Sequence, residues 1–567
     1  MKPATHTRHA HLHSLAHAVA VGLLIHLGAP AFAAPSALPR EPLPADSLVL
    51  HPWRGGVDPR PAITGIQKGD GDLELLLRWS GLGGPYRIEQ RSSLDADSWT
   101  AVGSPTTDHS LSVPADSGTG FFRIQAPRPD YLGDTVCLAC HRSAHQGWAE
   151  SPHRQALETL KRIGQASNPT CLPCHTVGYG LPGGFVSDAA TPRLGGVQCE
   201  SCHGPGGRHV ADPGDLLARP VVSLASMTCG GCHNDFHHPL YDDWLTSGHR
   251  AVTPSLAADF QHTNPATAEA RMRSCGACHS GAVRLAMLKG LKDEDTPPSM
   301  PAQTHAAHTA ITCSVCHTAH EKTAFGSQLR NPPHSMDFFS YSTSTNTTFA
   351  AQYREDINLC GQCHNQRGAR WQDTSRPPHH SPQYNFLVGD VGFSLGTPRH
   401  SSHRDIARQC THCHTAGFEF GGPSEEEFHL TGHSFKPLSV NCAPCHTPEE
   451  AEAFVGFTQR LVRNQIAEVK ALLDTWGETR APEPLRTQYG KLTWEYNVAG
   501  QISQRPDLPS PRGPTPAEQS VVPDAIKQAR FFLYMVEHDG SYGVHNGMYA
   551  RHLLDEARKL VTASMAE

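Results

Sequence analysis

The 567-residue chain contains no run of 18 or more apolar residues, which excludes a polytopic membrane protein. It also lacks any arginine-rich stripe, and its formal net charge is -7, which excludes a polybasic nucleic-acid-binding protein. Cysteine is absent before Cys137, so no lipid-anchoring cysteine lies near the amino terminus. Methionine is scarce, with nine residues in all. By contrast, the chain contains 18 Cys and 38 His, which is more than folding alone requires.

The first 33 residues have the pattern of a secretory signal. Lys2 and Arg8 precede an apolar stretch from Ala18 to Ala29, and Ala31-Phe32-Ala33 forms an Ala-x-Ala cleavage site. We therefore expect export to the periplasm or the cell exterior, with Ala34 as the first mature residue. The Pro-rich residues 34–61 are predicted to be a linker.

All 18 Cys occur as C-x-x-C pairs, and His follows each pair directly. We number the nine motifs in chain order by their two Cys and their His: Cys137, Cys140, His141; Cys171, Cys174, His175; Cys199, Cys202, His203; Cys229, Cys232, His233; Cys275, Cys278, His279; Cys313, Cys316, His317; Cys360, Cys363, His364; Cys410, Cys413, His414; Cys442, Cys445, His446.

C-x-x-C-H is the attachment sequence of c-type haem, in which two thiols bind one porphyrin edge and the His ligates the iron. An exported chain with an even number of Cys would otherwise suggest disulfides, but the regular spacing overrules that interpretation. A zinc ribbon needs no His after each pair. The sequence therefore predicts nine covalently attached haem c groups, with no catalytic residue identified.

The second iron ligand is predicted to be mostly His. Only five Met lie within the motif region, whereas 18 His lie between Cys137 and His446 beyond those of the motifs. Trp148-x-x-Ser151-x-His153 and Trp244-x-x-Ser247-x-His249 repeat one frame, so both His are strong candidates. His412 lies inside a motif and is left out. The full set of candidate second ligands is His153, His209, His249, His308, His320, His334, His379, His433 and His545.

Three regions follow from composition. Strand-like runs at 73–79, 86–91, 98–102, 110–113 and 121–124 predict a β-sandwich over residues 62–126. Residues 130–447 hold all nine motifs. From Cys275 to His446 only 27 of 172 residues are Leu, Ile, Val or Phe, so haem must form much of the core.

Residues 448–567 are predicted to be helical. One helix is expected over 449–476, and a second is expected to open at the capping box Thr515-Pro-x-Glu518 and to end at Asp539-Gly540. A final helix carries Tyr549, Leu553, Ala557 and Leu560. The predicted fold class is therefore mixed: a small β-sandwich, a loop-rich haem-packed domain with short helices, and a carboxy-terminal helical bundle.

Three segments, Trp148–His153, the stretch around motif 2, and Gly196–His209, resemble the cytochrome c-554 family of multihaem cytochromes. The later motifs and the helical tail resemble the wider superfamily of multihaem nitrite reductases and hydroxylamine oxidoreductases. The resemblance implies stacked haem pairs, bis-His irons and periplasmic electron transfer. That family has four haems, so its ligand order does not transfer beyond His279. Residues 86–99 weakly resemble fibronectin type III modules.

Two functions from different classes remain open. The first is an electron-transfer cytochrome with no substrate of its own, acting in anaerobic-type respiration. The second is an oxidoreductase with one open haem that acts on a small nitrogen or sulfur compound. A filament-forming cytochrome is a third reading. Expected partners are redox proteins such as other cytochromes, attracted if cationic, because the mature chain carries -9 and the haem propionates bring it to about -18. Neither nucleic acid nor a membrane span is expected, and the helical tail suggests a homodimer.

Overall fold

The structure is a computed structural model. Within 62–566 it describes all residues except 69–73, 81–85, 92–98, 105, 107, 109, 115–120, 126–129, 235–237, 293–298, 322–326, 331–358, 392–394, 396–398, 407–408, 416–417, 421–427, 444, 499, 501 and 503–511. The predicted signal segment, the predicted linker and His334 lie outside the described residues.

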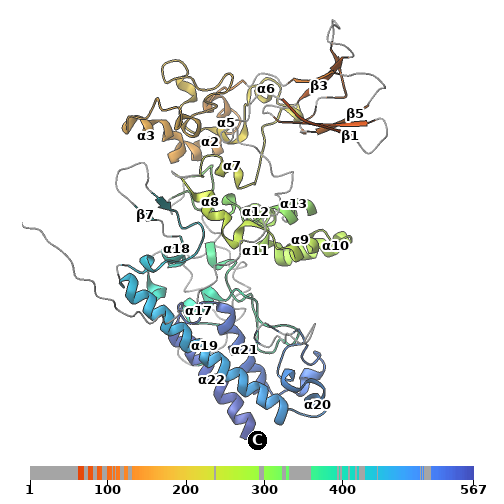
Figure 1. Ribbon diagram of the computed structural model, residues 1–567, viewed down its shortest axis with the longest axis vertical. Helices are drawn as coiled ribbons and strands as arrows, with labels where there is room; N and C mark the ends of the chain where they lie inside the picture. Colours follow the sequence, from red (N-terminus) through yellow and green to blue (C-terminus); the bar gives the residue numbers. More distant parts are fainter. Residues whose placement is uncertain are drawn as a thin grey trace, which may run out of the picture. The chain divides into compact units, whose positions relative to one another are not determined.

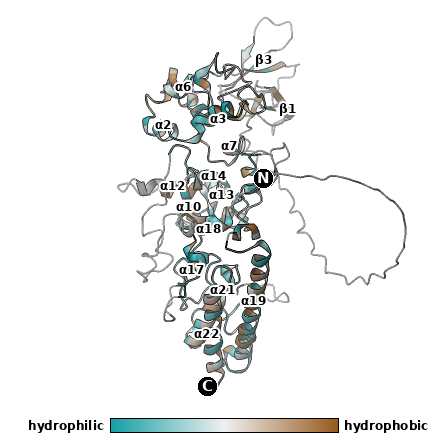
Figure 2. Cartoon of the chain, turned by 90° about the vertical axis from the view of Figure 1, so that its left-hand side faces the viewer, coloured by the Kyte–Doolittle hydropathy of each residue, from teal (hydrophilic) through white to brown (hydrophobic). Residues whose placement is uncertain are grey.

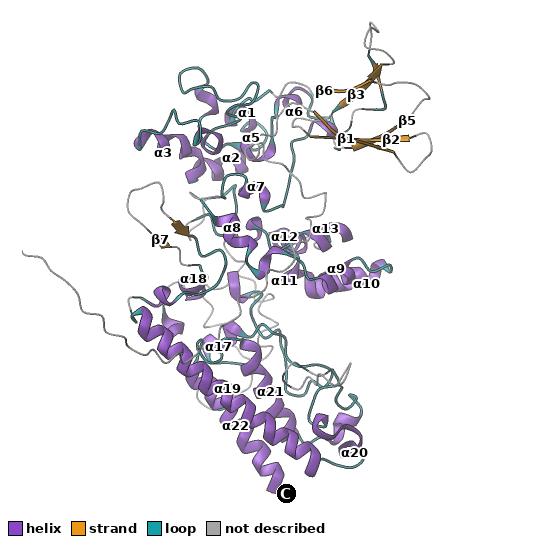
Figure 3. Ribbon diagram, in the orientation of Figure 1, coloured by secondary structure: helices purple, strands orange, loops and turns teal. Residues whose placement is uncertain are grey.

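The amino-terminal region forms two small antiparallel sheets (Figures 1 and 3). One has the strand order β1-β2-β5 and the other β4-β3-β6. Their bounds are β1 Ala62–Lys68, β2 Glu74–Ser80, β3 Arg87–Arg91, β4 Thr100–Ala101, β5 Ser110–Pro114 and β6 Phe121–Gln125. This confirms the predicted antiparallel β-structure. The fibronectin-like assignment stays a prediction.

Alternation along the strands explains the sheet core. Leu77 and Trp79 on β2 point to one face and are buried with Tyr86, Ile88 on β3 and Val113 on β5. The sequence reading missed β1. This strand contains Gly65, a residue depleted in strands, and its pairing with β2 shifts register between Ile63 and Gly65.

The motif region is made of short helices joined by loops (Figure 3). Its α-helices are α1 Asp134–Cys137, α2 Arg142–Ala149, α3 Ala156–Arg162, α4 Leu172–His175, α5 Cys199–His203, α6 Gly207–Ala211, α7 Met227–Gly230, α8 Leu240–Leu245, α9 Pro254–Phe260, α10 Pro265–Arg271, α11 Ala277–His279, α12 Gly281–Lys292, α13 Gln303–His308, α14 Cys313–Cys316, α17 Gln383–Val388 and α18 Gln409–His414. A strand pair, β7 Phe418–Phe420 and β8 Phe428–Leu430, follows.

Apolar packing in this region is thin. One cluster of seven buried side chains surrounds Leu157 and Leu194, and another of five surrounds Phe260 and Val283. Isolated helices of four to twelve residues are unstable in water unless tertiary packing holds them. The protein core here is therefore too small to explain the order of the region by itself.

Three long helices form the carboxy-terminal part: α19 Pro448–Thr479, α21 Asp524–Asp539 and α22 Gly547–Ala566, with the short α20 Leu485–Tyr489 between them. They lie side by side in Figure 1, and Figure 2 shows hydrophobic and hydrophilic residues along each of them. Their shared core has 26 buried residues, including Trp476, Trp494 and Phe532. The predicted carboxy-terminal helices are confirmed.

The predicted start of the second long helix is wrong. Thr515 and Glu518 do form reciprocal capping hydrogen bonds, but they cap only a turn and the 3-10 helix Glu518–Val521. Val522 is extended because it precedes Pro523, and α21 begins at Asp524. The end at Asp539 is as predicted, with Gly540 in the left-handed conformation.

Part of the motif region packs into this helical core. Phe386 and Val391 belong to it, and the buried Arg530 guanidinium donates to the Asp373 carbonyl. Hydrogen bonds from the amides of Asn497 and Val498 reach the carbonyls of 374 and 375. The helices thus hold the segment that precedes α17 in place. In the described part of the chain, no helix is long and apolar enough to cross a membrane.

Candidate functional site: a chain of haem-attachment motifs

Motifs 1 to 8 form helical turns in whole or in part, which places the two thiols and the imidazole of each together. In motifs 1, 4, 6, 7 and 9 the His amide donates to the carbonyl of the first Cys, at 2.9 to 3.1 Å. Residues i, i+3 and i+4 of a helix share one face, so both Cys and the His point the same way. None of the 18 Cys forms a disulfide. This is the arrangement that thioether attachment to one porphyrin edge requires.

A single cavity of 3480 Å³ runs past all nine motif His. Ordinary small-molecule pockets measure roughly 300 to 1,000 Å³, so this space suits a row of large groups and not one ligand. Residues of all nine motifs are part of its walls.

Seven of the nine motif His face a second imidazole. A His nitrogen lies about 2.0 Å from a metal, so two imidazoles on opposite sides of one iron have ring centres roughly 6 Å apart. The observed ring-centre separations are 5.8 to 6.4 Å in seven pairs: His141–His209, His203–His320, His233–His153, His279–His379, His317–His433, His364–His249 and His414–His545. The residues present therefore fit haem iron with two His ligands.

Hydrogen bonds orient many of these rings. The Nδ1 atoms of His175, His203, His317 and His414 lie 2.6 to 2.9 Å from backbone carbonyl oxygens, as does that of His433 at 3.1 Å. A carbonyl only accepts, so Nδ1 donates and Nε2 keeps the lone pair that a metal needs.

Burial favours the neutral form of three of the paired imidazoles. It lowers the pKa of His233 and of His249 to about 4, and that of His379 to about 3, with smaller contributions from neighbouring charged groups. Neutral His is the form that ligates a metal, so these rings are available at physiological pH.

The two Trp frames make the same contacts in two places. The indole of Trp148 donates to the Val197 carbonyl, and that of Trp244 donates to the Ile311 carbonyl. The amides of Val197 and Ile311 in turn donate to the carbonyls of His153 and His249. Each frame therefore forms two hydrogen bonds with the residue that lies two positions before a later motif. This residue is Val197 before motif 3 and Ile311 before motif 6. The structure therefore repeats with a period of three motifs.

Thiols of different motifs lie near one another, which gives an order of neighbours. Hydrogen-bonded thiol pairs join motifs 1 and 3, 2 and 4, 4 and 6, 5 and 7, and 7 and 8. The thiols of motifs 3 and 4, 6 and 7, and 8 and 9 are near enough to interact electrostatically. The motifs form one line in the order 1-3-4-6-7-8-9, with motif 2 branching at 4 and motif 5 branching at 7.

Two predicted ligands do not join this arrangement. His308 is exposed, and its Nε2 lies 3.0 Å from the Gln261 amide nitrogen; His334 lies outside the described residues. Within the described part of the chain, no second imidazole stands in ring contact with His175 or His446. His446 instead has the ring of Phe454 at 5.6 Å.

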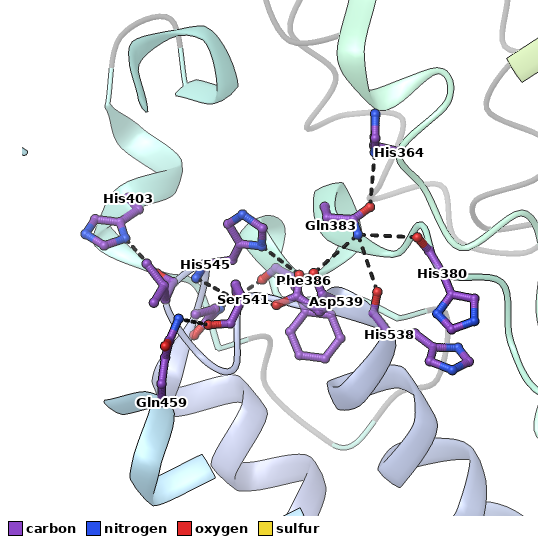
Figure 4. Close-up of polar contacts among 12 residues, drawn as sticks. His364, His380, Gln383, Phe386, His403, Gln459, His538, Asp539, Ser541 and His545 are labelled. Carbon is purple, nitrogen blue, oxygen red and sulfur yellow. Dashed lines mark hydrogen bonds and ion pairs between the residues drawn. The ribbon is translucent and has the colours of Figure 1, made fainter. Parts of the chain in front are cut away.

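The sequence reading missed two His near the motifs. His238 lies 6.1 Å from His233, on a segment with no distinguishing pattern. His403 begins a 3-10 helix, Ser402–Asp405, whose preceding Ser401 hydroxyl accepts from the His403 amide, as Ser247 does for His249. The signal was the repeated Ser-x-His-Arg, which lacks its Trp here. His403 Nδ1 donates to the Val544 carbonyl (Figure 4).

Residues 136–204 and 359–447 match the family described as cytochrome c554 and c-prime. Cytochrome c-554 of Nitrosomonas europaea is 36% identical over 91 residues, which cover 13% of this chain and 39% of that protein. The chain thus spans well under two thirds of this relative. The crystal structure of the outer cell wall cytochrome OcwA aligns with 76% of this chain and 99% of its own, at 17% identity and a TM-score of 0.48.

The two matched segments contain motifs 1 to 3 and motifs 7 to 9, which are the first three and the last three motifs in chain order. The middle group, motifs 4 to 6, carries the same Trp clamp as the first. The predicted resemblance is confirmed: residues 136–204 and 359–447 of this chain are similar to the multihaem cytochromes of the cytochrome c554 family.

Proposed function

We propose that this protein is an exported electron carrier that binds nine haem c groups and passes electrons along the line 1-3-4-6-7-8-9. The observation that carries the proposal is the contact between thiols of successive motifs, because the thiols mark the porphyrin edges. When bound, haem supplies a one-electron redox centre at each motif. Export is supported by the signal pattern of residues 1–33 and by the covalent haem chemistry that the motifs imply.

The residues of the chain do three things in this proposal. The 18 thiols attach the porphyrins, the nine motif His bind one side of the irons, and the seven paired His close the other side. His ligation on both sides keeps the potentials low, because a Met ligand would raise them. Redox partner proteins complete the pathway, and cationic ones suit the negative charge of the chain. A homodimer through the helical tail remains a prediction.

The test is a count of connected redox centres. Iron analysis of the purified holoprotein should give nine irons per chain, and voltammetry of an adsorbed film should show all of them exchanging electrons reversibly. A chain with nine irons of which only one or two exchange electrons would contradict the carrier function.

A second candidate function is catalysis at an open iron. Among the described residues, His175 and His446 have no imidazole opposite them, so motifs 2 and 9 are the two places for it. An iron with one free position there would act on a small nitrogen or sulfur compound. Electron paramagnetic resonance separates the two functions: a high-spin signal supports an open iron, and a purely low-spin spectrum rejects it.

The ligand pairs make a direct prediction for the two Trp frames. His153→Ala should convert the iron of motif 4 to high spin, and His249→Ala should do the same at motif 7, because each removes the imidazole that is paired with the motif His. His308→Ala, at an exposed His outside the pairs, is the matched control and should leave the spectrum unchanged. Electron paramagnetic resonance at equal haem content measures the effect. Fully low-spin spectra in both variants would refute the pairing.

The Asp539 carboxylate is hydrogen-bonded to the predicted iron ligand His545, so we expect it to shift the reduction potential of the haem at motif 8. His545 Nδ1 lies 2.6 Å from Asp539 Oδ1, and although burial opposes it, this carboxylate raises the pKa of His545 (Figure 4). Such a partner makes the imidazole a stronger donor and stabilises ferric iron. Asp539→Asn should therefore raise the potential of the motif 8 haem by tens of millivolts in a spectroelectrochemical titration.

The control for this change is Asp474→Asn. Asp474 binds Lys470 and the Trp494 indole within the helical core and contacts no motif His. If both variants shift the potentials alike, the effect is a general loss of negative charge and the specific role of Asp539 is wrong.

A further inference from the structure

Three potential metal ligands meet outside the line of motifs, where the end of α21 faces the loop before α17. They are His380 on the loop and Glu537 and His538 on the helix. Their donor atoms all lie within 4.8 Å of one another. The rings of His380 and His538 have centres 3.7 Å apart, and Figure 4 shows them as neighbours.

His538 is held in one orientation. Its Nδ1 lies 2.7 Å from the Pro378 carbonyl oxygen, so Nδ1 is the donor and Nε2 carries a lone pair. The residue is only 4% exposed, and Nε2 is buried without a hydrogen-bond partner. The nearest charged atom is Glu537 Oε2 at 3.3 Å, which is also an acceptor.

Two acceptors that face each other need a cation between them. A buried acceptor without a partner is unfavourable, and a bound metal ion removes the problem.

We propose that His380, Glu537 and His538 bind one divalent transition-metal ion of the zinc type. Two imidazoles and one carboxylate are a ligand set that Zn²⁺ uses in proteins, with a fourth position left for water. The carbonyl of Pro378 behind His538 is the kind of outer partner that orients a metal-binding His.

Small side-chain movements would bring the three ligands to the distances that one metal ion requires. Tetrahedral ligands at about 2.0 Å from the ion lie roughly 3.3 Å from one another, somewhat closer than the 4.8 Å limit found here. His380 is exposed and Glu537 is half-buried, so these two side chains can rotate toward the fixed His538.

The site would also influence two motifs. His380 follows His379, which faces His279 of motif 5. Gln383 accepts from His364 of motif 7 and donates to the His538 carbonyl (Figure 4). A divalent cation favours the electron-bearing form of nearby centres, so zinc should raise the potentials of these two haems. This consequence rests on the proposed function, whereas the binding does not.

The test is zinc binding to the full-length holoprotein. Samples stripped with a chelator are dialysed against zinc chloride, and zinc and iron are counted by mass spectrometry. We expect one zinc per chain, and at least a tenfold weaker affinity in Glu537→Gln and His380→Ala. His538→Ala should also weaken zinc binding, but it removes a buried side chain. The result is therefore judged from the substitutions at the two less buried residues, Glu537 and His380. His308→Ala is the control and should bind as the natural chain does.

Absence of a stoichiometric zinc overturns the proposal, and so does equal affinity in the natural chain, Glu537→Gln and His380→Ala. A potential shift with zinc that persists in Glu537→Gln would place the ion elsewhere and also reject it. Binding is measured without a redox assay. A protein that binds zinc but fails to carry electrons would therefore refute only the electron-transfer function.

Discussion

A chain made without residues 1–33, and so without haem attachment, is expected to leave most of residues 130–447 unfolded while its carboxy-terminal helices fold. The reason lies in where the apolar core is. The helical tail shares a core of 26 buried residues, whereas the larger clusters of the motif region have seven and five. Each fully buried large apolar side chain contributes roughly 1.5 to 3 kcal/mol, so apolar burial stabilises the tail several times more than either cluster of the motif region.

Limited proteolysis with mass spectrometry measures this. We expect a resistant fragment that starts near Thr447 and reaches the carboxyl terminus, and a second one over the sheets of residues 62–125. The holoprotein is the control and should resist digestion throughout the motif region. A resistant haem-free fragment spanning Cys275–His446 would show that protein packing, and not porphyrin, holds this region together.

Removing the haem of motif 7 is expected to divide the protein into electrically separate parts. The thiols of motif 7 interact with those of motifs 5, 6 and 8, and in the described part of the chain these are the thiol interactions that connect motifs 8 and 9 to the rest. The double substitution Cys360→Ala and Cys363→Ala prevents attachment there. When the protein exchanges electrons with an electrode through motif 9, the charge passed on fast voltammetric scans should then fall from nine electrons to two.

The matched control removes a branch. The thiol interaction seen for motif 2 leads to motif 4, at a branch of the line, so Cys171→Ala with Cys174→Ala should leave eight electrons connected. Both variants lose two thiols and one haem, which separates the effect of position from that of haem loss. Iron analysis must show eight irons in each. An equal charge in the two variants would mean that electrons do not follow the line that the thiol contacts describe.

The attachment chemistry was readable from the sequence because it is local. Two thiols and one imidazole within five residues define a haem site whatever surrounds them, and no tertiary information is needed to find the nine motifs. The sheets and the long helices were readable for a similar reason, since alternation and helical periodicity are properties of short segments. The same logic identified His153 and His249 as candidates through their shared Trp frame.

Tertiary structure decided which residues face one another. His153 pairs with His233 and His249 with His364, across 80 and 115 residues, and no local pattern states such a pairing. It also placed motif 3 beside motif 4 and gathered His380, Glu537 and His538 from segments that are far apart in the chain. Even α21 depended on context, because Pro523 and not the capping box determined its start. The geometry within one motif follows from the spacing of its residues along the chain. The spatial order of the motifs follows from packing between segments that are far apart in sequence, and sequence separation does not determine the distance between such segments.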